Sequence, residues 1–140
     1  MRFSGKIYKD GNYWLAEIPI IDAMTQGRTR KEAFAMVADM VESLVNYEGF
    51  KVEVFKGKNG NFELGSTDTR HMISLLLQRK RQLSGLSLAQ VANKLGMTSR
   101  NAYARYERGQ TVPTLGKLGE LLQAVSPEID IVINESAVAK

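Results

Sequence analysis

Two short helical segments that meet at a glycine constrain the fold of this chain more than any other feature. The segments cover residues 87–95 and 99–108, on either side of Gly96. Glycine can adopt the left-handed conformation that a tight turn between helices needs. Ala92 is small enough to let the second helix pack closely. We therefore predict two packed helices, the first with an inward arc made of Leu88, Val91, Ala92 and Leu95.

The second segment separates its aromatic and cationic side chains. At about 100° per residue, one arc carries Ala102, Tyr103 and Tyr106, and Glu107 lies at its margin. The other arc carries Arg100, Asn101, Ala104, Arg105 and Arg108. Arginine can bond guanine and asparagine can bond adenine in the major groove of DNA. A solvated charged helix is the alternative interpretation of this pattern.

The uneven distribution of charge favours nucleic acid as the partner of this region. Residues 67–110 contain eight Lys and Arg against two acids, an excess of +6, whereas residues 1–66 contain nine of each sign. Residues 111–140 have a net charge of −2. A cationic module beside a neutral one is typical of a polyanion-binding domain joined to something else.

The predicted DNA contacts are hydroxyls at the helix starts and cations near them. Hydroxyls and lysines contact phosphates, whereas arginine and asparagine also contact base edges. The predicted set is Ser87, Lys94, Thr98, Ser99, Arg100, Asn101, Arg105 and Arg108.

Further helices are predicted around this pair, followed by a strand. One helix covers residues 69–83 and starts at Thr67 or Asp68. A last helix follows Pro113, with Leu115, Leu118, Leu121, Leu122 and Val125 turned inward. Residues 129–133 alternate isoleucine with other residues and predict a short strand. That strand either pairs two copies of the chain or adds to a sheet of its own chain.

The N-terminal half has the pattern of a small sheet and one helix. Strands are predicted over residues 2–8, 13–18, 23–26 and 50–55, with a hairpin turn at Asp10-Gly11-Asn12. Thr29 and Glu32 have capping-box spacing at the start of a helix. The chain is thus predicted to be α+β, with a β-β-β-α-β domain over residues 1–65 and an all-α domain with a C-terminal strand over residues 66–140.

Several classes of function are disfavoured by the composition. There is no cysteine, so no disulfide or thiolate chemistry is expected, and no apolar run has the ~18 residues of a membrane span. The N-terminus lacks a signal peptide pattern, so we interpret the protein as cytosolic. The single histidine, His71, is expected to face solvent. One histidine is too few for a histidine-based metal site. We expect no cofactor and no metal.

Catalysis is also not expected. Metal-dependent nuclease chemistry needs several carboxylates that converge on two metal ions. The acids of the N-terminal half, among them Asp10, Asp22, Asp39 and Glu42, lie in a turn, in a loop and on a polar helix face. An RNA-processing enzyme is therefore our third hypothesis. The first two, given below, are both binding functions.

Residues 86–109, with Pro113 and residues 115–118, resemble the Cro/C1 (Xre-type) helix-turn-helix family. The resemblance implies five helices, of which the third contacts the major groove, and binding of operator DNA as a dimer. Leu88 stands where many members have a phosphate-binding glutamine, and the segment after Gly96 is about one residue longer than usual. The first residue of the DNA-contacting helix is therefore not fixed by the resemblance.

Residues 1–46 resemble the HicB antitoxin domain. The matching features are the hairpin at Gly11-Asn12-Tyr13-Trp14, the triplet Thr25-Gln26-Gly27 and the helix that opens at Thr29, while Ala23-Met24 replaces a frequent glycine-cysteine pair. With the C-terminal segment, the resemblance covers nearly the whole chain. It implies a partial ribonuclease-H-like fold, neutralisation of a HicA-type mRNA interferase, and repression of the toxin–antitoxin operon by a homodimer or higher even oligomer.

The contacts with such a toxin are less well indicated than those with DNA. A short sheet exposes an edge that another chain can pair with. Tyr8, Tyr13 and Leu15 are candidates for strand faces turned away from the helix, or else they complete a local core. The second hypothesis is a stand-alone transcription regulator whose N-terminal domain senses a small ligand.

Overall fold

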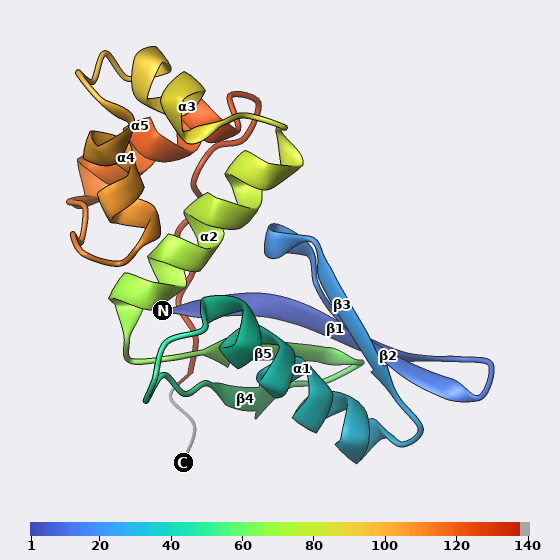
Figure 1. Cartoon of the computed structure of the whole chain (residues 1–140). Coiled ribbons are helices and arrows are strands. Elements are labelled where there is room, and N and C mark those ends of the chain that lie inside the picture. The colour runs from blue at the N-terminus through green and yellow to red at the C-terminus, as the bar shows by residue number, and fades with distance from the viewer. Residues whose placement is uncertain (138–140) are drawn as a thin grey trace. The chain divides into compact units, whose positions relative to one another are not determined.

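In a computed structural model, which describes residues 1–137, the chain divides into two compact units (Figure 1). The first comprises residues 1–72 and the second begins at Ile73. The division falls inside helix α2, Thr69–Leu83. The sequence places the domain boundary earlier, between residues 65 and 66, and that placement stays a prediction.

A five-stranded sheet forms the first unit (Figure 1). One α-helix connects the third and fourth strands in chain order. The strand order is β3-β2-β1-β5-β4, and all neighbours are antiparallel. The elements are β1 Arg2–Asp10, β2 Tyr13–Ile18, the 3-10 turn η1 Pro19–Ile21, β3 Ala23–Gly27, α1 Arg30–Val45, β4 Glu53–Lys56 and β5 Asn61–Gly65.

The first three strands and α1 agree with the prediction, but the end of the sheet does not. The strand predicted over residues 50–55 begins only at Glu53, because Phe50 closes a turn with Tyr47 and is buried in the core. A fifth strand, β5, follows in a segment for which the sequence predicted no strand. Its alternating Phe62 and Leu64 are both buried, so β5 depends on pairing with β1, which is distant in sequence.

Helix α1 covers one face of the sheet and is held there by close packing. The Phe34 ring meets the Phe62 ring edge to face, with 5.5 Å between centroids. Glycines allow this approach. A Cβ on Gly5 would lie 2.2 Å from the Phe62 ring, and a Cβ on Gly27 would lie 2.5 Å from the backbone nitrogen of Ala33. The glycine of the Thr25-Gln26-Gly27 triplet is therefore required by the start of α1.

The predicted cap of α1 is confirmed. The Thr29 hydroxyl accepts a hydrogen bond of 3.0 Å from the Glu32 amide. The Glu32 carboxylate reaches back to the amide of Arg28 at 3.3 Å, one residue before the position that a capping box would use.

The opposite face of the sheet carries Tyr8, Tyr13 and Leu15. Register places them there, because their strand neighbours Ile7 and Ala16 are buried on the α1 side. Tyr8 lies directly opposite Leu15, and the two tyrosines are each 41% exposed. Leu15 is half-buried. Neither tyrosine is therefore part of the buried core of the first unit.

The described part of the second unit contains most of α2 and three further helices: α3 Leu88–Lys94, α4 Arg100–Glu107 and α5 Leu115–Val125. Their core joins Ile73 and Leu77 of α2 to residues of the other three helices. Thr114 caps α5 by accepting a bond from the Lys117 amide. The inward position predicted for Leu115 is wrong. Leu115 is 65% exposed, because it lies in the first turn of α5, outside the arc of that helix that faces the core. The buried partners in that core are Val91, Ala92, Tyr103, Leu118, Leu121 and Val125.

The solvent-facing position expected for His71 is wrong. His71 is only 8% exposed, with its ring stacked on Tyr47 at 4.1 Å and its Nδ1 2.7 Å from Asp68. Burial alone raises the pKa of Asp68, but the hydrogen bonds from the His71 backbone and ring outweigh it and lower the pKa. Asp68 also caps α2, as predicted, by accepting from the His71 amide.

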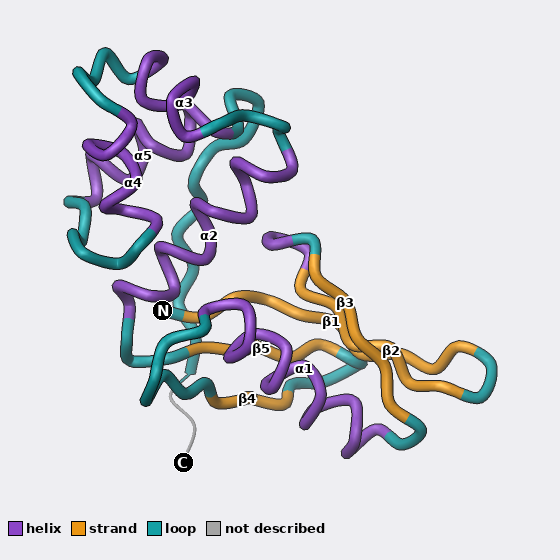
Figure 2. The backbone as a smooth tube through the Cα atoms, in the orientation of Figure 1, coloured by secondary structure: helices purple, strands orange, loops and turns teal. Residues whose placement is uncertain are grey.

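The C-terminal strand predicted over residues 129–133 is also wrong for the single chain. Figure 2 shows the described residues after α5 as loop, and residues 130–137 have no regular structure. Ile129, Val132 and Ile133 are at least half exposed. Alternating β-branched residues favour a strand only when a neighbouring strand completes the hydrogen bonds, and none does so here within residues 1–137.

The close approach at Gly27 predicts a large effect of a small substitution. Replacing Gly27 by alanine should lower the free energy of unfolding by about 1–3 kcal/mol, because the added methyl meets backbone that cannot move freely. Urea unfolding followed by circular dichroism measures this. Ser4→Ala, on the exposed side of β1, is the control and should change little. Equal stability of Gly27→Ala and the parent chain would contradict the packing described.

Candidate nucleic-acid interface

Helix α3 and the turn after it are fixed by local hydrogen bonds. Ser87 and Gln90 form a complete capping box: the hydroxyl accepts from the Gln90 amide at 3.1 Å, and the Gln90 side chain accepts from the Ser87 amide at 2.8 Å. Gly96 has φ +69°, the left-handed value expected for the turn residue. The Met97 amide then bonds the Ala92 carbonyl at 2.9 Å. The tight turn predicted between the two helices is therefore confirmed.

Helix α4 begins at Arg100, which settles the position that the sequence left open. Ser99 is the N-cap residue, with extended backbone and no cap hydrogen bond from its side chain. Thr98, Ser99, Arg100 and Asn101 are all exposed. This end of the helix thus combines hydroxyl, amide and guanidinium groups with the backbone N–H groups that a helix start leaves unpaired.

The buried side of α4 centres on Tyr103 and Ala104. Tyr103 is 0% and Ala104 1% exposed, whereas Ala102 and Tyr106 are only partly buried. The sequence placed Ala104 on the outer face, and this is wrong. The helix is rotated so that residues 103, 104 and 107 face the core, because Glu107 has a partner there.

That partner is Arg81 of α2. Its Nε and Nη2 donate to the two carboxylate oxygens of Glu107 at 2.7 and 2.9 Å, and its Nη1 donates to the Leu86 carbonyl at 3.0 Å. The Glu107 side chain is 6% exposed. The hydrogen bond from Arg81 to Glu107 raises the pKa of Arg81, and burial, with Glu107 beside it, raises the pKa of Tyr103.

The ion pair decides which charges α4 presents to solvent. Arg81 and Glu107 neutralise each other under the surface. The exposed charges that α4 and its C-cap leave are then Arg100, Arg105 and Arg108, with no exposed acid between them. Sequence reasoning missed this pair because its members lie in different helices, although the sign of each residue was visible.

Two predicted contacts that precede Gly96, Ser87 and Lys94, have structural roles. The Ser87 hydroxyl accepts in the cap of α3. The Lys94 ammonium donates to the carbonyl oxygen of Ala124 at 3.0 Å, near the end of α5. A lysine at a helix C-terminus is favoured by the helix dipole, so Lys94 contributes to the fold here.

Comparison with known families identifies the same segment. Residues 77–125 match the helix-turn-helix family. The match contains the second half of α2 and all of α3, α4 and α5, so it includes the Arg81–Glu107 pair and every predicted DNA contact. Among curated proteins, none matches the chain. The helix-turn-helix match supports a regulator that binds double-stranded DNA.

Neither a metal cluster nor a membrane span accompanies this domain in the part of the chain that the structure describes. No group of three His, Asp or Glu side chains within residues 1–137 is placed to hold a metal ion. Within the same range, no helix is both long and apolar enough to cross a membrane.

The ion pair predicts how the helix-turn-helix segment responds to a substitution. Glu107→Gln should lower the free energy of unfolding by about 2–3 kcal/mol, because it leaves the Arg81 guanidinium partly buried without an opposite charge. Arg81→Met combined with Glu107→Leu should recover part of the loss. Thermal unfolding measures both. If the double variant is no more stable than Glu107→Gln, the charge pair does not explain the packing of α4.

Proposed function

We propose that the chain is a type II antitoxin that represses its own operon. Its helix-turn-helix domain binds operator DNA, and its N-terminal domain binds and neutralises a HicA-type mRNA interferase. On this proposal the chain binds its partners and catalyses no reaction, without a cofactor or a metal. The observation that carries the regulatory part is the exposed cationic side of α4 above a buried tyrosine face.

The DNA contacts follow from the geometry of α4. Arg100 and Asn101 lie in its first turn, the end that enters the major groove in helix-turn-helix domains, and are suited to guanine and adenine edges. Thr98 and Ser99 precede them and are suited to phosphates. Arg105 and Arg108 lie further along the helix and add cationic contacts to the DNA backbone.

A dimer is the form in which such a domain binds operator DNA. Two copies match the twofold symmetry of a palindromic operator. Residues 129–133 support the assignment, since they are exposed, four of the five are β-branched, and no strand of the described chain pairs with them. On this proposal they form an antiparallel pair between two helix-turn-helix domains.

The toxin-binding part rests on the HicB resemblance and on the open face of the sheet. The proposal of a partial ribonuclease-H-like fold is supported by a five-stranded antiparallel sheet with one helix on one face. Tyr8, Tyr13 and Leu15 offer aromatic and aliphatic surface on strands β1 and β2. Tyrosine is enriched at protein interfaces because it combines a large apolar area with a hydroxyl.

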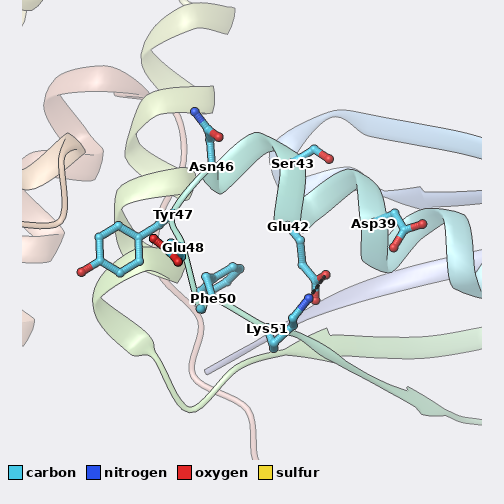
Figure 3. Close-up of a pocket in the computed structure, with 9 residues that line it drawn as sticks. Asp39, Glu42, Ser43, Asn46, Tyr47, Glu48, Phe50 and Lys51 are labelled. Atoms are coloured by element: carbon cyan, nitrogen blue, oxygen red, sulfur yellow. Dashed lines mark hydrogen bonds and ion pairs between the residues drawn. The ribbon is translucent and has the colours of Figure 1, made fainter.

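The second candidate, a regulator that senses a small ligand, has one observation in its favour. A depression of about 550 Å³ lies at the end of α1, and Figure 3 shows Asp39, Glu42 and Lys51 around it. The volume is in the range of small-molecule sites, but such sites are mostly apolar. Here Lys51 is bound to Glu42 at 3.4 Å, and Glu42 also accepts from the Val52 amide. We therefore favour the protein partner.

For DNA, we expect a selective loss when the first turn of α4 is changed. Arg100→Ala or Asn101→Ala should weaken binding to the chain's own promoter by about 1–3 kcal/mol and binding to random duplex very little. Fluorescence anisotropy at fixed salt measures both. Lys58→Ala, an exposed lysine of the N-terminal unit, is the control and should bind as the parent chain does. Equal losses on both duplexes would assign these residues to phosphates.

The salt dependence of DNA binding by Lys94→Ala distinguishes a structural role of Lys94 from a phosphate contact. If it caps α5, Lys94→Ala should lower stability and leave the salt dependence of binding unchanged. A phosphate contact would instead reduce the slope of log affinity against log salt by about 1.

For the toxin, we expect Tyr8→Ser combined with Tyr13→Ser to abolish co-purification with the product of a neighbouring toxin-sized gene. The reason is the loss of the exposed aromatic surface on β1 and β2. The control is Met36→Ser, which removes an exposed apolar side chain on α1. If the parent chain captures no neighbouring gene product, the ligand-sensing candidate replaces this part of the proposal.

A further inference from the structure

One asparagine of the chain has a chemistry that the proposed function does not use. Asn59 is the one asparagine in the sequence that is followed by glycine. It is exposed and lies in the connection between β4 and β5. The backbone nitrogen that follows an asparagine can attack the side-chain amide of that asparagine. A following glycine hinders the attack least, because it has no side chain.

Hydrogen bonds hold this connection as a tight turn. Asn59 and Gly60 both have positive φ, at +57° and +76°. The Asn61 amide donates to the Lys58 carbonyl at 3.0 Å, across these two residues. Two positive φ angles inside such a bond are the features of a type I′ turn. A second bond, from the Gly57 amide to the Asn61 carbonyl at 2.9 Å, closes the turn on the strand side.

The closed turn keeps the two reacting atoms apart. In a turn of this type, the backbone angle ψ of Asn59 is about +30°. The Gly60 nitrogen then lies nearly trans to the Asn59 Cβ about the bond between Cα and the carbonyl carbon. Ring closure requires the nitrogen and the Cβ to lie on the same side of that bond. The bond can rotate that far only after the hydrogen bonds of the turn have broken.

We propose that Asn59 is a self-modification site that reacts when the β4–β5 turn opens. The Gly60 nitrogen bonds to the side-chain amide carbon of Asn59, and the side-chain nitrogen leaves as ammonia with the proton of the Gly60 amide. A cyclic imide remains. Water then adds to one of its two carbonyl carbons and gives aspartate or isoaspartate. Water is the one co-reactant, and the reaction involves neither DNA nor a toxin.

Of the two products, isoaspartate does not fit the turn. It routes the backbone through the former side chain and lengthens it by one carbon atom. Gly60 has little room to move, because its carbonyl accepts from the Ile7 amide at 2.8 Å. A Cβ on Gly60 would lie 2.5 Å from the Ile7 carbonyl oxygen. Isoaspartate should therefore break the contact between the turn and β1, whereas aspartate keeps the backbone length and tolerates positive φ.

Peptide mapping of the full chain tests both the site and its dependence on the turn. The chain is incubated at mildly alkaline pH, either folded or unfolded in guanidinium chloride, and conversion of each asparagine is followed by mass spectrometry. We expect Asn59 to convert first in the unfolded chain. In the folded chain it should convert at least about tenfold more slowly, because the rate is scaled by the fraction of open turn. Asn46 is the internal reference, since Tyr47 follows it and hinders ring closure.

A glycine substitution opens the turn and leaves Asn59 and Gly60 in place. A Cβ on Gly57 would lie 2.8 Å from the Asn61 carbonyl oxygen, which is the acceptor of the Gly57 amide. Gly57→Ala should therefore increase the rate at Asn59 in the folded chain by at least about threefold. Gly116→Ala is the control, because it adds the same methyl to an exposed glycine of α5 with no atom within 4 Å. Circular dichroism checks that both variants are folded.

Four outcomes would overturn the proposal. Faster conversion of another asparagine in the unfolded chain would contradict the site. An equal rate at Asn59 in the folded and unfolded chains would contradict protection by the turn. So would a folded Gly57→Ala chain that converts Asn59 at the parent rate. The fourth outcome is a purified isoaspartate form with the thermal stability of the parent chain, which would show that the longer backbone fits the turn.

Discussion

The bidentate ion pair between Arg81 and Glu107 fixes the orientation of the helix on which the DNA-binding function depends. It joins α2 to the end of α4 beside the buried ring of Tyr103. Burying two charges is costly, and close geometry with further hydrogen bonds compensates for that cost. Both conditions are met, since Arg81 also bonds the Leu86 carbonyl. The consequence is that the one acid of α4 is hidden and its arginines remain outside.

How much the sequence predicted depends on how local each determinant is. Thr29 and Ser87 were predicted at helix starts, and Gly96 as a turn residue, because each acts within a few residues of itself. The helix-turn-helix segment consists almost entirely of such signals. Its bounds were therefore predicted within one or two residues, and the candidate DNA contacts could be named.

The errors share a different cause, which is dependence on a distant partner. Strand β5 needs β1, the rotation that buries Ala104 needs Arg81, and the buried position of His71 needs Tyr47. The strand predicted over residues 129–133 has the right residues but lacks a neighbouring strand. In the dimer proposed for operator binding, residues 129–133 of a second copy supply that neighbouring strand. The proposal therefore accounts for a strand pattern that has no partner within one chain.

The DNA-binding proposal requires the exposed side of α4 to lie against the duplex, and amide chemical shifts report on that contact residue by residue. Titration of the isotope-labelled chain with a duplex of its own promoter should shift the amides of residues 98–101, 105 and 108. The amides of α1 should stay unchanged. Shifts confined to the N-terminal unit, or a helix α4 left unperturbed by a duplex that binds, would contradict this assignment of the DNA-binding surface.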